Sequence, residues 1–150
     1  MTIKRSDKAP DFSLPSTNGK IFTLSADQKG KPCILYFYPK DFTGGCTAEA
    51  CDFRNNFEEF KGLNIDVYGI STDPIATHLR FKKKYELPYE LLSDEKGEVI
   101  RLYNAKVPFV NLTRRITYLL DENHFIKEVY SNMFNINEHV RKMLSEAKAG

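Results

Sequence analysis

The 150-residue sequence contains no tryptophan and only three cysteines, and it has neither a long apolar segment nor a marked excess of one charge. Its longest apolar runs, such as "CILYFY" and "ITYLL", have the length of strands and are too short to span a bilayer. The formal net charge is +2, so nucleic acid and anionic membranes are poor candidates as partners. The N-terminal stretch "MTIKRSDKAPDF" lacks an apolar signal-peptide core, and an odd cysteine count fits a reducing compartment. We therefore expect a cytoplasmic protein.

The order of the apolar segments predicts a single α/β domain over residues 1–150, a length that suits one compact unit. Two short strands around Asn18-Gly19 predict an N-terminal β-hairpin. Further strands are predicted at 32–39, 65–72, 115–121 and 125–131. Amphipathic helices are predicted at 46–61, 74–87 and 135–147. This order indicates a thioredoxin-like fold, with a central mixed β-sheet flanked by helices.

Two of the cysteines lie in "FTGGCTAEAC" (42–51), which joins a buried strand to a helix. Ligand sites of open α/β sheets gather at such carboxyl ends of strands. Cys46 begins the predicted helix, where unpaired N–H groups and a partial positive charge favour a thiolate. It also shares the apolar face of that helix with Phe53, and Gly44 and Gly45 would let a substrate approach closely. We expect an activated thiolate in an apolar pocket; the alternative is a small core residue.

Cys51 follows Cys46 by five residues, which an intact helix would place about 8.6 Å away between Cα atoms. A disulfide needs roughly 4.4–6.8 Å. If the two cysteines pair, the first turn of the helix must therefore unwind. Cys51 taken alone fits a core residue as well as a reactive thiol, and Cys33, inside an apolar strand, is interpreted as a core residue.

A metal site needs three or four converging ligands. The sequence contains three histidines, His78, His124 and His139. They show no metal-ligand spacing among themselves or with the cysteines. We therefore expect no metal site and no cofactor.

The segment "YFYPKDFTGGCTAEACDFRNNF" (36–57) closely resembles the active-site segment of the peroxiredoxins, in the branch called peroxiredoxin Q or bacterioferritin comigratory protein. Its Pro-x3-Thr-x2-Cys spacing, formed by Pro39, Thr43 and Cys46, is specific. The stretches "APDFSLPSTNGKIFTLS", "VYGISTD", "LLSDEKGEV" and "RRITYLLDENHFI" resemble other segments of that family in the same order. The resemblance therefore covers most of the chain.

The resemblance implies a thiol-dependent peroxidase that reduces hydrogen peroxide and small organic hydroperoxides. Cys46 matches the peroxidatic cysteine, whose thiolate attacks the O–O bond and becomes a sulfenic acid. Thr43 matches the threonine that holds peroxide and thiolate, and Pro39 matches the proline that shields the pocket from water. Arg115 matches the arginine that stabilises the thiolate, with its neighbour Arg114 as the alternative in register.

Other positions follow from the same resemblance. The backbone N–H groups of Gly45 and Cys46 would supply further donors to the substrate. Glu49 matches an acidic or amide position, and would otherwise be a carboxylate favoured by the helix dipole. Cys51 matches the resolving cysteine, which forms an intramolecular disulfide after local unwinding; a thioredoxin-like dithiol then reduces it. A monomer suffices for this cycle. Gly44 departs from the usual proline, which predicts a loop that is costlier to order.

Two other functions stay open on the residues alone. A dithiol–disulfide oxidoreductase acting on protein thiols would share the layout, although the chain has no C-x-x-C. A non-catalytic binding module would give Thr43 and Arg115 no reason to converge. The basic stretch "RFKKKYE" (80–86) is either an interaction patch or a solvated helix face.

Overall fold

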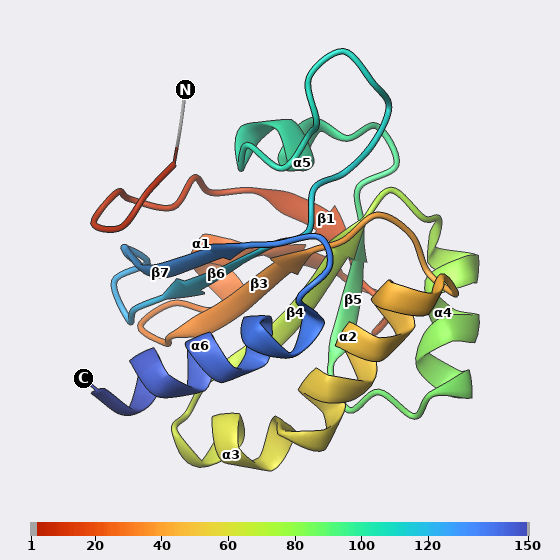
Figure 1. Ribbon diagram of the computed structural model, residues 1–150. Coiled ribbons are helices and arrows are strands. Elements are labelled where there is room, and N and C mark those ends of the chain that lie inside the picture. Colours follow the sequence, from red (N-terminus) through yellow and green to blue (C-terminus); the bar gives the residue numbers. More distant parts are fainter. Residues whose placement is uncertain (1–2, 150) are drawn as a thin grey trace.

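A five-stranded mixed sheet, covered on both faces, forms the centre of the molecule (Figure 1). The computed structural model describes residues 3–149. The strands are β1 (Ser13–Pro15), β2 (Ile21–Thr23), β3 (Cys33–Phe37), β4 (Asp66–Ser71), β5 (Glu90–Ser93), β6 (Ile116–Leu120) and β7 (Ile126–Ser131). The helices are α1 (Leu24–Asp27), α2 (Gly44–Asn55), α3 (Phe57–Gly62), α4 (Ile75–Lys84), α5 (Glu98–Leu102) and α6 (Ile136–Ala149).

The strands of the central sheet lie in the order β5-β4-β3-β6-β7. β3, β4 and β5 run parallel, whereas β6 is antiparallel to both β3 and β7. β1 and β2 pair separately as an antiparallel hairpin, in which Gly19 takes a positive φ in the turn. The predicted thioredoxin-like class is therefore confirmed, including the mixed sheet and the N-terminal hairpin.

Four features differ from the prediction. α1, β5 and α5 were not predicted, because elements of four or five residues carry too few positions to show a periodicity. The helix predicted at 46–61 is divided into α2 and α3 at Asn56, whose backbone leaves the helical region. The Asn56 side chain donates to the carbonyl oxygen of Asp52 at 2.8 Å, and such side-chain competition for backbone groups disfavours a continuous helix.

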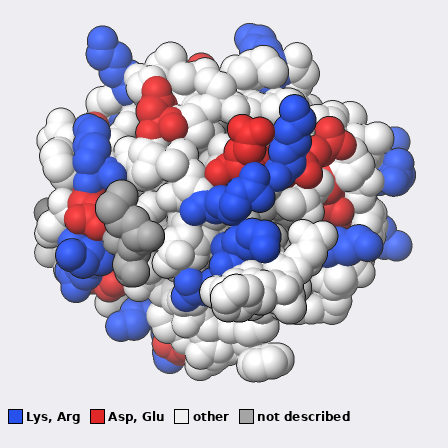
Figure 2. All heavy atoms as spheres, turned by 90° about the horizontal axis from the view of Figure 1, so that it is seen from above, with Lys and Arg blue, Asp and Glu red and all other residues white. Residues whose placement is uncertain are grey.

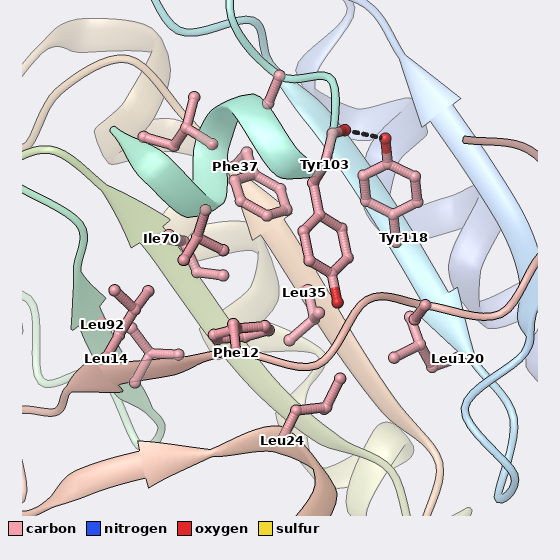
Figure 3. Packing of buried hydrophobic residues seen from close by; sticks show 14 of the residues in the cluster. Phe12, Leu14, Leu24, Leu35, Phe37, Ile70, Leu92, Tyr103, Tyr118 and Leu120 are labelled. Carbon is pink, nitrogen blue, oxygen red and sulfur yellow. Dashed lines mark hydrogen bonds between the residues drawn. The ribbon is translucent and has the colours of Figure 1, made fainter. Parts of the chain in front are cut away.

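The central strand β3 buries both of its faces, as its continuous apolar run predicted. Cys33, Leu35 and Phe37 point to one side, where the hairpin, α1 and α5 cover the sheet (Figures 1 and 3). Ile34 and Tyr36 point to the other side, where they pack against residues of α2, α3, α4 and α6. We call these the hairpin face and the helical face.

The side of the molecule seen from above carries charges of both signs. Figure 2 shows lysine and arginine side chains interspersed there with aspartate and glutamate, as the small net charge leads one to expect.

The lysines of 80–86 lie in the last turn of α4, where cations complement the helix dipole. Among the described residues, no helix has the length and apolarity required to cross a bilayer.

Candidate active site around Cys46

Cys46 lies in the first turn of α2, directly after the loop that leaves the carboxyl end of β3. Thr43 precedes the helix with an extended backbone and makes no side-chain cap. The first intrahelical bond runs from Thr47 N–H to the carbonyl oxygen of Thr43, so the N–H groups of Gly44, Gly45 and Cys46 have no intrahelical acceptor. The Cys46 side chain is only 1% exposed and packs on the helical face. The structure thus places a buried thiol at a helix N-terminus.

The Arg115 guanidinium lies against this thiol. Arg115 directly precedes β6, whose first residue pairs with the last residue of β3, and this register brings the side chain to the start of α2. Its Nη2 donates to Cys46 Sγ at 3.4 Å, and its Nη1 donates to Glu49 Oε1 at 2.7 Å. Burial opposes the charge of Arg115, but the Glu49 carboxylate and the Cys46 sulfur raise the pKa of its guanidinium above the ordinary value. Arg114 points elsewhere, to the carbonyl oxygen of Asn104.

A glycine beside Cys46 makes room for this arginine. A Cβ atom added to Gly45 would lie 3.0 Å from Arg115 Nη2 and 3.7 Å from Ile136 Cδ1. Gly44 differs, because a Cβ atom there would meet nothing within 4 Å. A side chain at Gly45 would therefore require the Arg115 guanidinium to shift, whereas one at Gly44 has room.

Glu49 lies one turn after Cys46 on α2 and is fully buried. Burial raises the pKa of its carboxyl group to about 7, with the Arg115 guanidinium opposing this shift and Asp52 adding to it. Its second oxygen, Oε2, has no hydrogen-bond partner among the described residues. A buried carboxyl group with one bare oxygen is costly when ionised, so this oxygen is a favourable place for a proton.

His139 of α6 is a member of the site that the sequence did not reveal. Its Nδ1 lies 3.5 Å from Glu49 Oε2 and 2.9 Å from Thr117 Oγ1, while its Nε2 lies 2.8 Å from the carbonyl oxygen of Asn132. Burial lowers the pKa of His139 to about 4. In the sequence, His139 falls on the apolar stripe of an amphipathic helix, a pattern typical of a core residue.

The remaining predicted residues surround the loop before α2. Pro39 is half-buried, and Thr43 is exposed. The Thr43 hydroxyl donates to the carbonyl oxygen of Lys40 at 2.8 Å, and no hydrogen bond joins it to Cys46 among the described residues. Phe42 takes a positive φ and packs edge-on against Phe81 of α4. The expected roles of Pro39 and Thr43 therefore stay predictions.

All three cysteines are free thiols. Cys51 is half-buried and lies in α2 with Cys46, so the intact helix keeps the two apart. Cys33 is fully buried in β3, and burial raises the pKa of its thiol far above the ordinary value. That environment keeps Cys33 protonated and fits its interpretation as a core residue.

A pair of buried tyrosines holds the middle of α2. The Tyr89 hydroxyl, just before β5, donates to the carbonyl oxygen of Ala50 at 2.9 Å and lies 2.8 Å from the Tyr36 hydroxyl. The Tyr36 ring in turn stacks on Phe53, with ring centroids 4.5 Å apart. These contacts stabilise the helical form of the segment between the two cysteines.

A second buried polar cluster holds the loop before α2 through hydrogen bonds to Asp41. His78 Nδ1 lies 2.6 Å from Asp41 Oδ2, Tyr38 donates to Asp41 Oδ1 at 2.6 Å, and the Asp41 N–H donates to Asp73 Oδ2 at 2.8 Å. The ligand-type atoms of Asp41, Asp73 and His78 lie within 4.8 Å of one another. Spacing of histidines and cysteines could not find this group, because its other members are aspartates from separate loops. Each of its side chains already has partners in the protein, and Ser71 is one of them, so the cluster fits a structural role.

Comparison with known proteins assigns the family. The family model described as AhpC/TSA matches residues 6–129. The chain belongs to the AhpC/TSA family. Chloroplastic peroxiredoxin Q of Arabidopsis thaliana is 44% identical over 148 residues, which are 98% of this chain and 68% of that protein. Chloroplastic peroxiredoxin Q of Oryza sativa subsp. japonica is 41% identical over 143 residues, or 95% of this chain. The chain spans only 65% of the length of that rice protein.

Solved structures give the same assignment within the family. Peroxidoxin BcpB from Mycobacterium tuberculosis superposes with a TM-score of 0.92 at 33% identity, covering 98% of this chain and 97% of that one. Peroxiredoxin Q of Xanthomonas campestris superposes with a TM-score of 0.86 at 28% identity, covering 92% and 90%. The chain is therefore a member of the peroxiredoxin Q branch, as the sequence resemblance implied.

Proposed function

We propose that this protein is a thiol-dependent peroxidase that reduces hydrogen peroxide and small organic hydroperoxides. The observation that carries the proposal is the contact between the Arg115 guanidinium and the buried Cys46 sulfur at the start of α2. A guanidinium in that place offers donors to the sulfur and to an incoming oxygen atom. Membership of the peroxiredoxin Q branch supports the same activity.

In the proposed reaction, the Cys46 thiolate attacks one oxygen of the peroxide. An S–O bond forms while the O–O bond breaks, sulfur is oxidised to a sulfenic acid, and the electron pair leaves on the second oxygen. Charge develops on both oxygens, so fixed donors lower the barrier. Arg115 and the unpaired N–H groups of Gly45 and Cys46 are the donors at hand, Thr43 would hold the peroxide, and Pro39 would shield it from water.

Cys51 is the proposed resolving thiol. Its attack on the sulfenic acid releases water and forms an intramolecular disulfide, which requires the segment from Cys46 to Cys51 to leave the helical conformation. A thioredoxin-like dithiol would reduce the disulfide by exchange, and a cytoplasmic location would supply one. Because both thiols belong to one chain, a monomer is a sufficient working unit.

A coupled assay with thioredoxin, thioredoxin reductase and NADPH tests this function. Cys46→Ser should abolish peroxide-dependent NADPH oxidation, and Cys51→Ser should lose turnover but still consume one equivalent of peroxide. Cys33→Ala is the matched control and should retain turnover. Full activity of Cys46→Ser would contradict the proposal, and insulin reduction without peroxide consumption would favour the dithiol oxidoreductase instead.

A further inference from the structure

Only one of the two oxygens of the Glu49 carboxyl group has a hydrogen-bond partner among the described residues. Its Oε1 accepts from Arg115 at 2.7 Å, whereas Oε2 has no partner among the described residues and lies 3.5 Å from His139 Nδ1. Both side chains are fully buried between α2 and α6. The 3.5 Å separation is too long for a good hydrogen bond, yet no other described atom serves Oε2.

Hydrogen bonding fixes the tautomer of His139. Its Nε2 faces the carbonyl oxygen of Asn132, which only accepts, so Nε2 carries hydrogen. In the neutral ring Nδ1 then has a lone pair, and the Thr117 hydroxyl donates to it. Glu49 Oε2 lies 3.5 Å from the same nitrogen, so an ionised carboxylate would face the lone pair that already accepts from Thr117. A proton on Oε2 removes this repulsion between two acceptors.

The charged groups around Arg115 indicate that the Cys46 thiol is the source of this proton. One guanidinium contacts both the Cys46 sulfur and the Glu49 carboxyl group. A thiolate together with a carboxylate would leave an uncompensated negative charge in a buried place, which is costly. Cys46 and Glu49 are three residues apart on α2 and therefore neighbours on its surface. Once the thiol has ionised, a proton on the Glu49 carboxyl group removes this extra negative charge.

The surrounding groups favour Glu49 over His139 as the holder of the proton. Burial raises the pKa of Glu49 to about 7 and lowers the pKa of His139 to about 4, and Arg115 also lowers the latter. The other titratable or charged groups that face the pair are Cys46 and Asp52 on α2, Tyr36 on β3, Tyr89 before β5 and Tyr130 on β7.

We propose that Glu49 and His139 together store the proton that Cys46 loses on becoming a thiolate, and that this store supplies the leaving oxygen of the peroxide. The inference rests on the proposed peroxidase function. Glu49 would carry the proton, and His139, held by Asn132 and Thr117, is a positioning residue that offers it an acceptor.

The step balances without a further reactant. Cys46–SH and Glu49–COO⁻ become Cys46–S⁻ and Glu49–COOH. The thiolate then forms its S–O bond with one oxygen of the peroxide ROOH, the O–O bond breaks, and RO⁻ leaves. Glu49–COOH protonates RO⁻ to give ROH and returns to the carboxylate. Sulfur is oxidised, the peroxide is reduced, and the proton of the thiol ends on the product.

Nuclear magnetic resonance tests the proton store without relying on catalysis. The carboxyl carbon of Glu49, labelled with 13C and assigned with Glu49→Gln, should titrate near pH 7 in the reduced protein. His139→Phe removes the acceptor and should lower that midpoint by about half a unit to one unit. Cys46→Ser removes the thiolate and should also lower it. His124→Phe is the matched control, because His124 is a buried histidine at the far end of the sheet whose ring meets the carbonyl oxygen of Gln28, and it should change nothing.

Further measurements separate this inference from the proposed function. In the wild-type protein at pH 7, 15N spectra should show the His139 ring neutral, with hydrogen on Nε2; an imidazolium there would overturn the proton store even if His139→Phe does not fold. A Glu49 midpoint near 4, or one unchanged by His139→Phe, would overturn it too. The midpoint of the pH dependence of peroxide reduction should move down by the same half unit to one unit in His139→Phe; a profile identical to wild type would contradict the proposal. A normal Glu49 titration in a protein that does not consume peroxide would overturn the proposed function alone.

Discussion

Replacement of Tyr89 by phenylalanine should speed formation of the disulfide between Cys46 and Cys51. The Tyr89 hydroxyl donates to the carbonyl oxygen of Ala50, which lies within the segment that has to unwind. This bond exists only in the helical form of α2, so its loss destabilises that form relative to the unwound one. A net hydrogen bond contributes about 0.5–1.5 kcal/mol, which corresponds to about a 2-fold to 13-fold increase in the unwound population.

The phenylalanine also removes the partner of the Tyr36 hydroxyl. Tyr36 belongs to β3, which does not unwind, so this second loss should affect both forms of α2 alike. It should lower the free energy of global unfolding by about 1–3 kcal/mol. Tyr118→Phe is the matched control, because the Tyr118 hydroxyl donates to the carbonyl oxygen of Tyr103 on the hairpin face, away from α2 (Figure 3).

The assay follows the disulfide directly. Reduced protein is mixed with one equivalent of hydrogen peroxide, quenched with acid at intervals, alkylated, and analysed by mass spectrometry. Tyr89→Phe should form the disulfide faster and should accumulate less sulfinic acid at high peroxide, because resolution competes with over-oxidation. An unchanged or slower rate in Tyr89→Phe, or an equal acceleration in Tyr118→Phe, would refute the reasoning.

Four further variants test the site in other ways. Gly44→Pro should raise the free energy of unfolding by about 0.4–1 kcal/mol, because Gly44 is the first residue of α2 and has open space around it; a lower urea midpoint would contradict this. Gly45→Ala should displace the Arg115 guanidinium and slow peroxide reduction by about 10-fold to 100-fold, and an unchanged rate constant would show that the contact is irrelevant. Because folding raises the pKa of Glu49, the contribution of Glu49 to stability is present at low pH and is lost as pH rises from 4.5 to about 7. Folding lowers the pKa of His139, so the contribution of His139 to stability is present at high pH and is lost as pH falls from 6.5 to about 4. Urea unfolding should therefore show stability rising with pH over this range in Glu49→Gln and falling in His139→Phe, with slopes of up to about 1.4 kcal/mol per pH unit; parallel curves would contradict the two shifts.

The long elements of the fold were predictable because each has a clear hydrophobic pattern. The apolar run of β3 and the stripes of α2 and α6 determine which faces are buried, and the glycine turn determines the hairpin. The break at Asn56 was not predictable from periodicity, because the apolar stripe continues across it into α3. The Asn56 side chain donates to the carbonyl oxygen of Asp52 at this break, a contact that periodicity does not reveal.

The residues of the site also divide into those that the sequence could predict and those that it could not. Cys46 and Glu49 lie on one helix, so their proximity follows from spacing alone. Arg115 was assigned through the family resemblance, and the pairing of β3 with β6 accounts for its position. His139 and Thr117 could not be assigned, because their approach to Glu49 depends on how α6 packs across α2 and β6. A histidine on an apolar stripe carries no signal of that packing.

The central claim is that Cys46 reacts with peroxide and that Cys51 resolves the product. Peptide-mapped mass spectrometry of the reduced protein after one equivalent of hydrogen peroxide, with alkylation of the remaining thiols, tests it most directly. The account predicts rapid loss of two hydrogens, a link between Cys46 and Cys51, and an alkylated Cys33. A link between Cys46 and Cys33 would contradict the assigned resolving thiol, and three unmodified thiols would contradict the peroxidase itself.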